Sequence, residues 1–255
     1  MVFTGHSSIW ENGCRLAVTD TDGSLATADV DTELLDTIRR RSSSFKAGGP
    51  YSRIYIGEGS QTGFADNLFR QIEKHPFAPA DDLDYTCSKI IDLQTRALVT
   101  RLEKLNCKAV LGISGGLDST LALIVTVLAF DRLGWKHEDI IAVTMPGFGT
   151  TNRTKNNAWE LMKALGVTCR EISIKAACDQ HFKDIDHDPS KHDATYENTQ
   201  ARERTQILMD IANQTNGIVV GTGDLSELAL GWATYNGDHM SMYGVNADIP
   251  KTLVR

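Results

Sequence analysis

The sequence predicts an α/β protein whose parallel sheet is flanked by helices, with a smaller β-rich segment at the N-terminus. Three observations carry this prediction. From about residue 84 onward, short apolar stretches alternate with helical patterns, which is typical of strands joined by crossover helices. Two of these stretches, 109–113 and 218–221, end in glycine-rich turns that open directly into helices. The first 30 residues instead contain a hairpin pattern around Asn12-Gly13.

The N-terminal part is expected to contain a hairpin over 8–18, a further strand over 26–30 and a helix over 33–41. The hairpin rests on Asn12-Gly13, because this dipeptide favours the left-handed turn that two-residue hairpins need. Residues 46–80 contain several glycines and prolines without a regular apolar period, which is typical of a connector.

Beyond this connector, the apolar spacing predicts helices and strands in alternation. The expected helices are 85–105, 117–133, 154–165, 195–214 and one that begins at 224. The expected strands are 109–113, 140–145, 169–174 and 218–221. Strands and helices in this order form a parallel sheet covered on both faces, and such sheets bind ligands beyond the carboxyl ends of their strands.

Composition narrows the functional class. The net charge of −7 argues against a nucleic-acid partner, and no apolar run approaches the roughly 20 residues of a membrane span. The five cysteines form no CxxC pair and no zinc spacing, so we expect free thiols in a reducing compartment. These features predict a cytoplasmic protein without a membrane or nucleic-acid partner.

The most informative motif is the run from Gly112 to Ser119, which reads GISGGLDS. Its adjacent glycines allow backbone N–H groups to turn inward, and the following helix directs the positive end of its dipole to the same point. Asp118 adds a hard oxygen ligand suited to Mg²⁺. No lysine follows the glycines, so the GxxxxGK[ST] loop is excluded. The run predicts a site for a polyphosphate and its metal; the alternative is an ordinary glycine-rich turn.

A second motif covers residues 221–228, GTGDLSEL, and again follows a short apolar strand. Glu227 lies about one turn inside the predicted helix, where its carboxylate can point toward the loop that carries Asp118. A metal on a polyphosphate needs carboxylates from separate elements to be held firmly. The alternative is that Glu227 only complements the positive end of its own helix.

The run 114–119 resembles the SGGxDS pyrophosphate loop of the ATP pyrophosphatase superfamily, whose members release pyrophosphate and leave AMP on the substrate. From 113 to 255 the chain resembles the synthetase domain of NAD⁺ synthetases, particularly the glutamine-dependent form. The matching runs are SGGLDS at 114–119, MPGFGTT at 145–151, YENTQARER at 196–204, GTGDLSELAL at 221–230 and GWATYNGDHMS at 231–241.

The first 30 residues resemble the last strands of the nitrilase-like glutaminase domain that precedes the synthetase in this family. The resemblance implies a glutaminase remnant over 1–45, a linker over 46–83 and a synthetase domain over 84–255. The catalytic Glu, Lys and Cys of the glutaminase are expected upstream of Met1. The family's C-terminal helices are expected beyond Arg255, which makes the chain a fragment.

The resemblance also implies roles for individual residues, and none of them is a catalytic nucleophile. The positions that match ATP-binding residues are Gly112, Ile113, Ser114, Gly115, Gly116, Leu117, Asp118, Ser119, Thr222 and Lys251. The positions that match the binding site of deamido-NAD⁺ are Asn198, Arg202, Glu227, Trp232, Ala233, Thr234 and Tyr235. The positions that match Mg²⁺ ligands are Asp118 and Glu227. Because Arg202 and Arg204 lie two apart on one helix, they face different ways, and at most one should contact substrate.

The activity implied by the resemblance is the ATP-dependent amidation of deamido-NAD⁺ to NAD⁺ through an acyl-adenylate. Its partners are small molecules: ATP with Mg²⁺, deamido-NAD⁺, and ammonia that comes from glutamine in the intact enzyme. A homo-oligomer is expected. Two alternatives stay open: another ATP pyrophosphatase such as a GMP synthetase or a tRNA thiolase, and a nucleotide-binding module without turnover. The stretch 181–193 is rich in His and Asp but has no zinc spacing, and a solvated loop is expected there.

Overall fold

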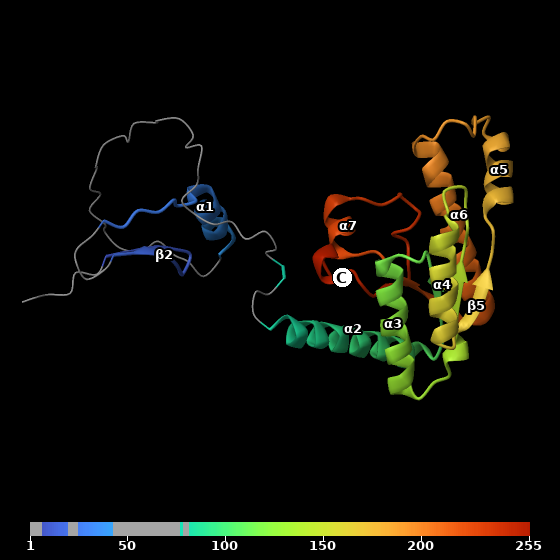
Figure 1. Ribbon diagram of the computed structural model, residues 1–255, viewed down its shortest axis with the longest axis horizontal. Coiled ribbons are helices and arrows are strands. Elements are labelled where there is room, and N and C mark those ends of the chain that lie inside the picture. Colours follow the sequence, from blue (N-terminus) through green and yellow to red (C-terminus); the bar gives the residue numbers. More distant parts are fainter. Residues whose placement is uncertain (1–6, 20–24, 43–76, 79–81) are drawn as a thin grey trace, which may run out of the picture. The chain divides into compact units, whose positions relative to one another are not determined.

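The computed structural model describes residues 7–19, 25–42, 77–78 and 82–255 (Figure 1). The chain divides into two units, residues 1–74 and 75–255, and each is described by itself. The boundary between the units falls within the predicted linker of residues 46–83, most of which lies outside the described residues. The assignment of residues 1–45 and 84–255 to two functional domains stays a prediction.

The N-terminal unit contains the predicted hairpin and the predicted helix. Strands β1 (Ser8–Glu11) and β2 (Cys14–Val18) pair antiparallel around a turn in which Asn12 and Gly13 have φ of 46° and 82°. Positive φ at both positions is the geometry that favours Asn-Gly. Helix α1 (Thr32–Arg41) begins at Asp31, whose side chain accepts a hydrogen bond from the Leu34 N–H.

The strand predicted over 26–30 is wrong. Residues 25–31 form no strand, and the side chains of Leu25 and Val30 are exposed. A strand is stable only where a neighbouring edge pairs with its N–H and C=O groups, and within the described residues no edge pairs with this segment. The Asp31 N–H instead donates to the Glu11 carboxylate at 2.6 Å.

The second unit is built on a five-stranded parallel sheet. Its strands are β3 (Lys108–Gly112), β4 (Ile140–Thr144), β5 (Thr168–Glu171), β6 (Gly217–Gly221) and β7 (Tyr243–Gly244). The order across the sheet is β5-β4-β3-β6-β7, and the two-residue β7 was not predicted. The chain winds outward from β3 to β5 and then returns to the other side of β3. The winding therefore reverses between β3 and β6, which is where open α/β sheets bind their ligands.

Helices cover both faces of this sheet (Figure 1). They are α2 (Leu83–Leu105), α3 (Leu117–Leu133), α4 (Asn152–Ala164), α5 (Lys175–Asp184) and α6 (Ala194–Thr215). The short helix α7 (Leu225–Leu230) follows β6 and has no buried residue. Helices α2, α3 and α4 pack on one face around Leu111, whereas α5 and α6 pack on the other around Val110. Neighbouring residues of β3 thus face opposite layers, as the period of a strand requires. The prediction of a parallel sheet flanked by helices is confirmed.

Two predicted boundaries differ from the structure by more than two residues. The strand expected over 169–174 ends at Glu171, because Ile174 is buried where α5 begins. The loop expected over 181–193 is wrong in its first part, since 181–184 complete α5 and Phe182 is buried. The apolar face of α5 rests on few residues, chiefly Cys178 and Phe182, which is too sparse a pattern to indicate a helix.

None of the helices within the described residues has the length and hydropathy of a membrane span. The five cysteines, all of which lie in the described part of the chain, are free.

Candidate active site

The loop between β3 and α3 has a shape that only glycine permits. Gly115 has φ of +84°, and a Cβ at this position would lie 2.2 Å from the backbone oxygen of Thr154. Gly116 begins α3 in extended conformation and makes no side-chain hydrogen bond to the first turn of the helix. The positive end of a 17-residue helix therefore remains available to an anion.

The two serines of this loop hold its shape. The Ser119 hydroxyl donates to the Gly116 carbonyl at 3.0 Å, so Ser114 must be the donor in the 3.1 Å hydrogen bond between the two hydroxyls. The Gly116 N–H donates in turn to the Ser114 oxygen at 3.2 Å. The loop is thus fixed by its own side chains without a ligand.

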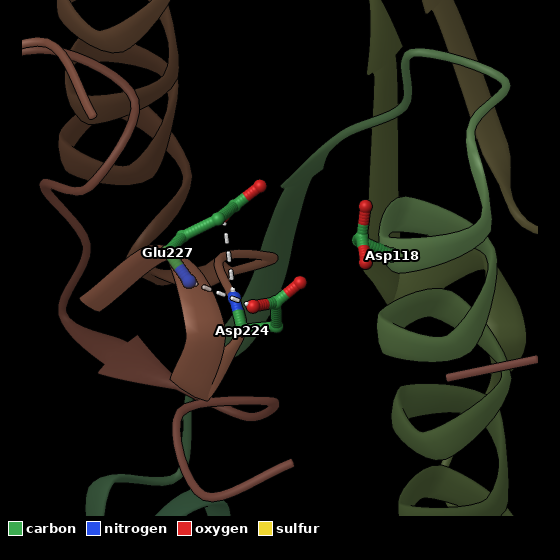
Figure 2. Close-up of side chains that lie close together, drawn as sticks. All are labelled: Asp118, Asp224 and Glu227. Carbon is green, nitrogen blue, oxygen red and sulfur yellow. Dashed lines mark hydrogen bonds between the residues drawn. The ribbon is translucent and has the colours of Figure 1, made fainter. Parts of the chain in front are cut away.

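The loop after β6 caps itself. Asp224 begins α7, and its Oδ1 accepts a hydrogen bond from the Glu227 N–H at 2.9 Å. The Glu227 Oε2 accepts from the Asp224 N–H at 3.3 Å, which completes a capping box (Figure 2). One carboxylate oxygen of Glu227 therefore serves the start of its own helix, which is the alternative role considered for this residue. The other oxygen faces Lys251.

Three carboxylates from the two loops meet in one place. Figure 2 shows Asp118 on α3 facing Asp224 and Glu227, and one oxygen from each lies within 4.8 Å of the others. The Asp224 side chain is fully buried, whereas Asp118 and Glu227 are partly exposed. Asp118 and Glu227 are predicted metal ligands, but Asp224 was missed. In the sequence, Asp224 is part of a D-x-x-E pattern, which indicates the start of a helix and does not indicate a metal ligand.

Lys251 lies among these carboxylates. Its Nζ is 2.9 Å from both oxygens of Asp118, 2.5 Å from Asp224 Oδ2 and 3.5 Å from Glu227 Oε1. Burial opposes the charge on Lys251, but the close contacts of its Nζ with the Asp224 and Asp118 carboxylates outweigh burial and raise the pKa of the ammonium above its usual value. Burial likewise opposes ionisation of Asp224, yet Lys251 and the Glu227 N–H lower the pKa of its carboxyl.

This cluster fits a divalent cation. Its donors are hard carboxylate oxygens from separate elements, which suit Mg²⁺. Asp224 Oδ2 is buried and accepts no hydrogen bond. Its contact with Lys251 Nζ is an ion pair that does not have the geometry of a hydrogen bond. When ionised, three carboxylates and one ammonium leave two negative charges. The site thus has the ligands and the charge for a metal ion on a polyphosphate.

Two adjoining cavities flank the cluster. The smaller, about 290 Å³, is lined by Asp118, Ser119 and Glu227 among others. The larger, about 530 Å³, is lined by Gly112, Ile113 and the strand ends of β4 and β6. Ser114 and Thr222 line both cavities. Most of the predicted ATP-binding residues therefore line these two cavities. The exceptions are Gly115, Gly116 and Leu117, which belong to the loop and the start of α3, and Lys251, which contacts the carboxylate cluster.

The predicted residues for the second substrate are more dispersed. The Thr234 hydroxyl donates to Asn198 Oδ1 at 2.8 Å, and Thr234 lines the larger cavity. Ala233 lines the smaller one. Trp232 and Tyr235 are 79% and 83% exposed and line neither.

Arg202 and Arg204 face different ways, as expected. Arg202 lines a separate groove of about 560 Å³, and its Nε donates to the Tyr235 carbonyl at 3.2 Å. Arg204 lines the larger cavity and donates to the Met145 carbonyl at 3.2 Å, and burial lowers the pKa of its guanidinium. The resemblance to the family favoured Arg202 as the substrate contact, but it is Arg204 that lies at the wall of the larger cavity. Spacing separates the faces of a helix but does not say which face meets the cavity.

Comparison with known proteins shows the family to which the chain belongs. The family model for NAD synthase matches residues 90–255. The glutamine-dependent NAD(+) synthetase of Mycobacterium leprae is 45% identical over 274 residues, which cover 100% of this chain and 40% of that protein. The structure of glutamine-dependent NAD+ synthetase from Acinetobacter baumannii in complex with ADP has a TM-score of 0.62 and 32% identity, covering 69% of this chain and 32% of that one.

An NH3-dependent NAD synthetase from Campylobacter jejuni has a TM-score of 0.58 and 25% identity, covering 66% of this chain and 70% of that one. The chain spans about 40% of the length of the M. leprae relative. These proteins are all NAD synthetases, so the alternative of a GMP synthetase-like enzyme is not favoured. The chain belongs to the NAD synthase family.

Proposed function

We propose that this chain is part of a glutamine-dependent NAD⁺ synthetase and supplies the site that amidates deamido-NAD⁺. The observation that carries the proposal is the carboxylate cluster of Asp118, Asp224 and Glu227 beside the open N-terminus of α3. In a member of the NAD synthase family, this pairing of cation and anion sites suits the magnesium–triphosphate end of ATP.

The reaction has two steps. An oxygen of the nicotinate carboxylate attacks the α-phosphorus of ATP, the bond from that phosphorus to the β-phosphate oxygen breaks, and pyrophosphate leaves. The nitrogen of ammonia then attacks the carbonyl carbon of the acyl-adenylate. The bond from this carbon to the AMP oxygen breaks, and loss of a proton leaves the amide. Neither step needs a side-chain nucleophile, so the protein contributes mainly position and charge.

The residues divide these tasks. We assign the β- and γ-phosphates to the loop 112–119, whose helix N-terminus stabilises the charge on the leaving pyrophosphate. Asp118 and Glu227, joined by Asp224, would hold Mg²⁺, which when bound neutralises phosphate charge. Thr222 lines both cavities and is assigned to ATP. Lys251 neutralises one of the three carboxylate charges and offers an ammonium to phosphate oxygens.

The second substrate is assigned to Thr234 at the wall of the larger cavity and to residues near it in the chain or in space. Asn198 and Thr234 are joined by a hydrogen bond, and Arg202 is fixed by the Tyr235 carbonyl. The exposed rings of Trp232 and Tyr235 offer faces on which a pyridine or adenine ring can stack. Ala233 completes this stretch. These contacts support a site for deamido-NAD⁺.

We further propose that ammonia comes from glutamine in the whole enzyme, that the enzyme is a homo-oligomer, and that it works in the cytoplasm. The first proposal follows from the 45% identity to a glutamine-dependent relative. The free cysteines support a reducing compartment.

The test supplies the chain with ATP, Mg²⁺, deamido-NAD⁺ and ammonium, and follows AMP and NAD⁺ together. We expect both products, and expect Asp118→Ala to abolish them. Asp139→Asn is the matched control, since this carboxylate pairs with Lys108 at the opposite end of β3. ATP binding without AMP or NAD⁺ would favour the alternative of a nucleotide-binding module without turnover.

A further inference from the structure

The β3–β6 pairing stops short of the candidate site. The ladder runs from Lys108–Gly217 to Val110–Val219, and the paired residues do not extend to the strand ends Gly112 and Gly221. The two loops that carry the carboxylates follow these unpaired ends. Sheet hydrogen bonds between β3 and β6 therefore do not fix the spacing of the loops.

A buried amide bridges the two loops instead. Asn246 is 0% exposed and follows the edge strand β7. Its Nδ2 donates to the Asp118 carbonyl at 3.0 Å and to the Thr222 carbonyl at 3.2 Å. Asp118 lies in the first turn of α3, directly after the loop that follows β3, and Thr222 lies in the loop after β6. One side chain thus joins the backbones of both loops.

The orientation of this amide is determined by its partners. The two carbonyl oxygens only accept hydrogen bonds, so the NH₂ group of Asn246 must face them. Its Oδ1 then accepts from Gln94 Nε2 on α2 at 3.2 Å. The same Gln94 nitrogen donates to the Val245 carbonyl at 2.8 Å, which fixes Gln94 even though its buried Oε1 has no hydrogen-bond partner.

We propose that Asn246 is a positioning residue for the metal. It sets the distance between Asp118 on one loop and Asp224 and Glu227 on the other, and Gln94 holds its amide in the orientation that does so. This inference rests on the proposed function, because it assigns the spacing to a magnesium–ATP complex. Asn246 touches backbone carbonyls and not the carboxylates, so it acts through the residues it holds.

Loss of the Asn246 bridge should weaken nucleotide binding in the presence of Mg²⁺ more than nucleotide binding in its absence. Without the bridge, the glycine loop still offers its N–H groups to phosphate, but the carboxylates of the two loops no longer share one metal. Groups that orient metal ligands typically change metal affinity by about 10–100-fold. We therefore expect Asn246→Leu to lower the gain in nucleotide affinity that Mg²⁺ supplies by about tenfold or more, and to change the affinity without Mg²⁺ much less.

The experiment titrates the full chain with α,β-methylene-ATP by calorimetry, once with Mg²⁺ and once with EDTA. Gln94→Met is the second variant; it leaves Asn246 in place and should lower the same gain by a smaller factor. Thr95→Val is the matched control, since this neighbouring buried hydroxyl bonds only within α2, to the Ile91 carbonyl at 2.7 Å. We expect the control to keep the wild-type gain.

A wild-type gain in Asn246→Leu, or an equal loss with and without Mg²⁺, would overturn the inference. If Asn246→Leu does not fold, Gln94→Met decides, because an unchanged gain there is equally contrary. A wild-type chain that gains no affinity from Mg²⁺ would overturn the proposed function and the inference with it. If Mg²⁺ raises nucleotide affinity in the wild type and raises it equally in both variants, the inference about Asn246 is overturned but the proposed function is not.

Discussion

The two loops at the reversal of the sheet occupy equivalent positions but offer opposite chemistry. The loop after β3 places glycine at the start of α3, which leaves the first N–H groups of this helix without a side-chain cap. The loop after β6 places Asp224 at the start of α7, where a capping box satisfies the same kind of group. The first loop can therefore receive an anion, whereas the second presents carboxylates and suits a cation.

This difference shows how one sheet edge can bind both parts of a metal–polyphosphate. The cap that closes the second helix to anions is also what holds the carboxylates of Asp224 and Glu227 beside Asp118. Neither loop is sufficient alone. Changes confined to one loop should therefore alter phosphate binding and metal binding to different extents.

The largest effect is expected from Gly115→Ala in the anion loop. A side chain here must adopt left-handed backbone geometry, which costs about 1–2 kcal/mol, and its Cβ would overlap the Thr154 oxygen. We expect nucleotide affinity to fall by more than about 100-fold with or without Mg²⁺. Calorimetry checks this result. Gly134→Ala at the far end of α3 is the control, because φ there is also positive but a Cβ meets nothing within 4 Å; equal behaviour of the two variants would contradict the steric argument.

A smaller and more selective effect is expected from Glu227→Gln in the cation loop. Glutamine keeps an oxygen that can accept from the Asp224 N–H, so the capping box survives, but the charge of one metal ligand is lost. We expect Mg²⁺-dependent nucleotide affinity to fall by about 10–100-fold while the thermal midpoint changes little. Affinity measured in EDTA should stay near that of the wild type. A large loss of thermal stability would show that Glu227 acts mainly as a cap.

Lys251→Met should make stability depend on the metal. Removing the ammonium leaves the buried Asp224 carboxylate without a cation, which costs about 1–3 kcal/mol, less than in a fully buried pair because Lys251 is 47% exposed. We expect a lower thermal midpoint without Mg²⁺ and partial recovery when Mg²⁺ is added. Thermal unfolding with and without the ion measures both. Absence of any recovery would argue against a cation site at the cluster.

The smallest effect concerns acid stability. The folded protein lowers the pKa of Asp224, so the unfolded chain binds its proton more readily. The stabilisation is present above the ordinary carboxyl pKa of about 4 and is lost as pH falls through the lower folded value. For Lys251, whose pKa is raised, stabilisation is lost only at alkaline pH, above its ordinary pKa of about 10.

Stability from the cluster should therefore change little between about pH 5 and pH 9. We expect Asp224→Asn to unfold about 2–4 °C below the wild type at pH 7, and this difference to shrink as pH falls below the ordinary carboxyl pKa of about 4. Circular dichroism melts at a series of pH values from neutral to strongly acidic provide the measurement. A difference that does not shrink in acid would mean that the lost stability comes from packing and not from charge.

Local patterns were sufficient for most of the fold and for one half of the site. The glycine loop could be predicted because its backbone geometry is written in adjacent residues: Gly115 supplies the positive φ, and an apolar strand and an apolar helix flank it. The helix of 117–133 and the hairpin turn at Asn12-Gly13 follow from equally local rules.

The failures lie where distant residues decide. The strand expected over 26–30 depends on a partner edge, and α5 depends on the few side chains that it buries. Lys251 lies 133 residues from Asp118 in the chain, and Asn246 lies 128 residues from it, yet both contact that residue. Neither the distance along the chain nor the residues beside Lys251 and Asn246 indicate that these two residues contact Asp118.

The amino-acid order alone was thus enough to indicate an α/β sheet, a polyphosphate loop and the carboxylates of Asp118 and Glu227, because each depends on a short segment. The addition of buried Asp224 to the cluster, the ammonium of Lys251 within it and the amide of Asn246 between the loops required the folded chain. The physical reason is that charge and hydrogen-bond energies depend on distance in space. The fold brings the ends of β3, β6 and β7 into one region, where contacts between residues distant in the chain become possible.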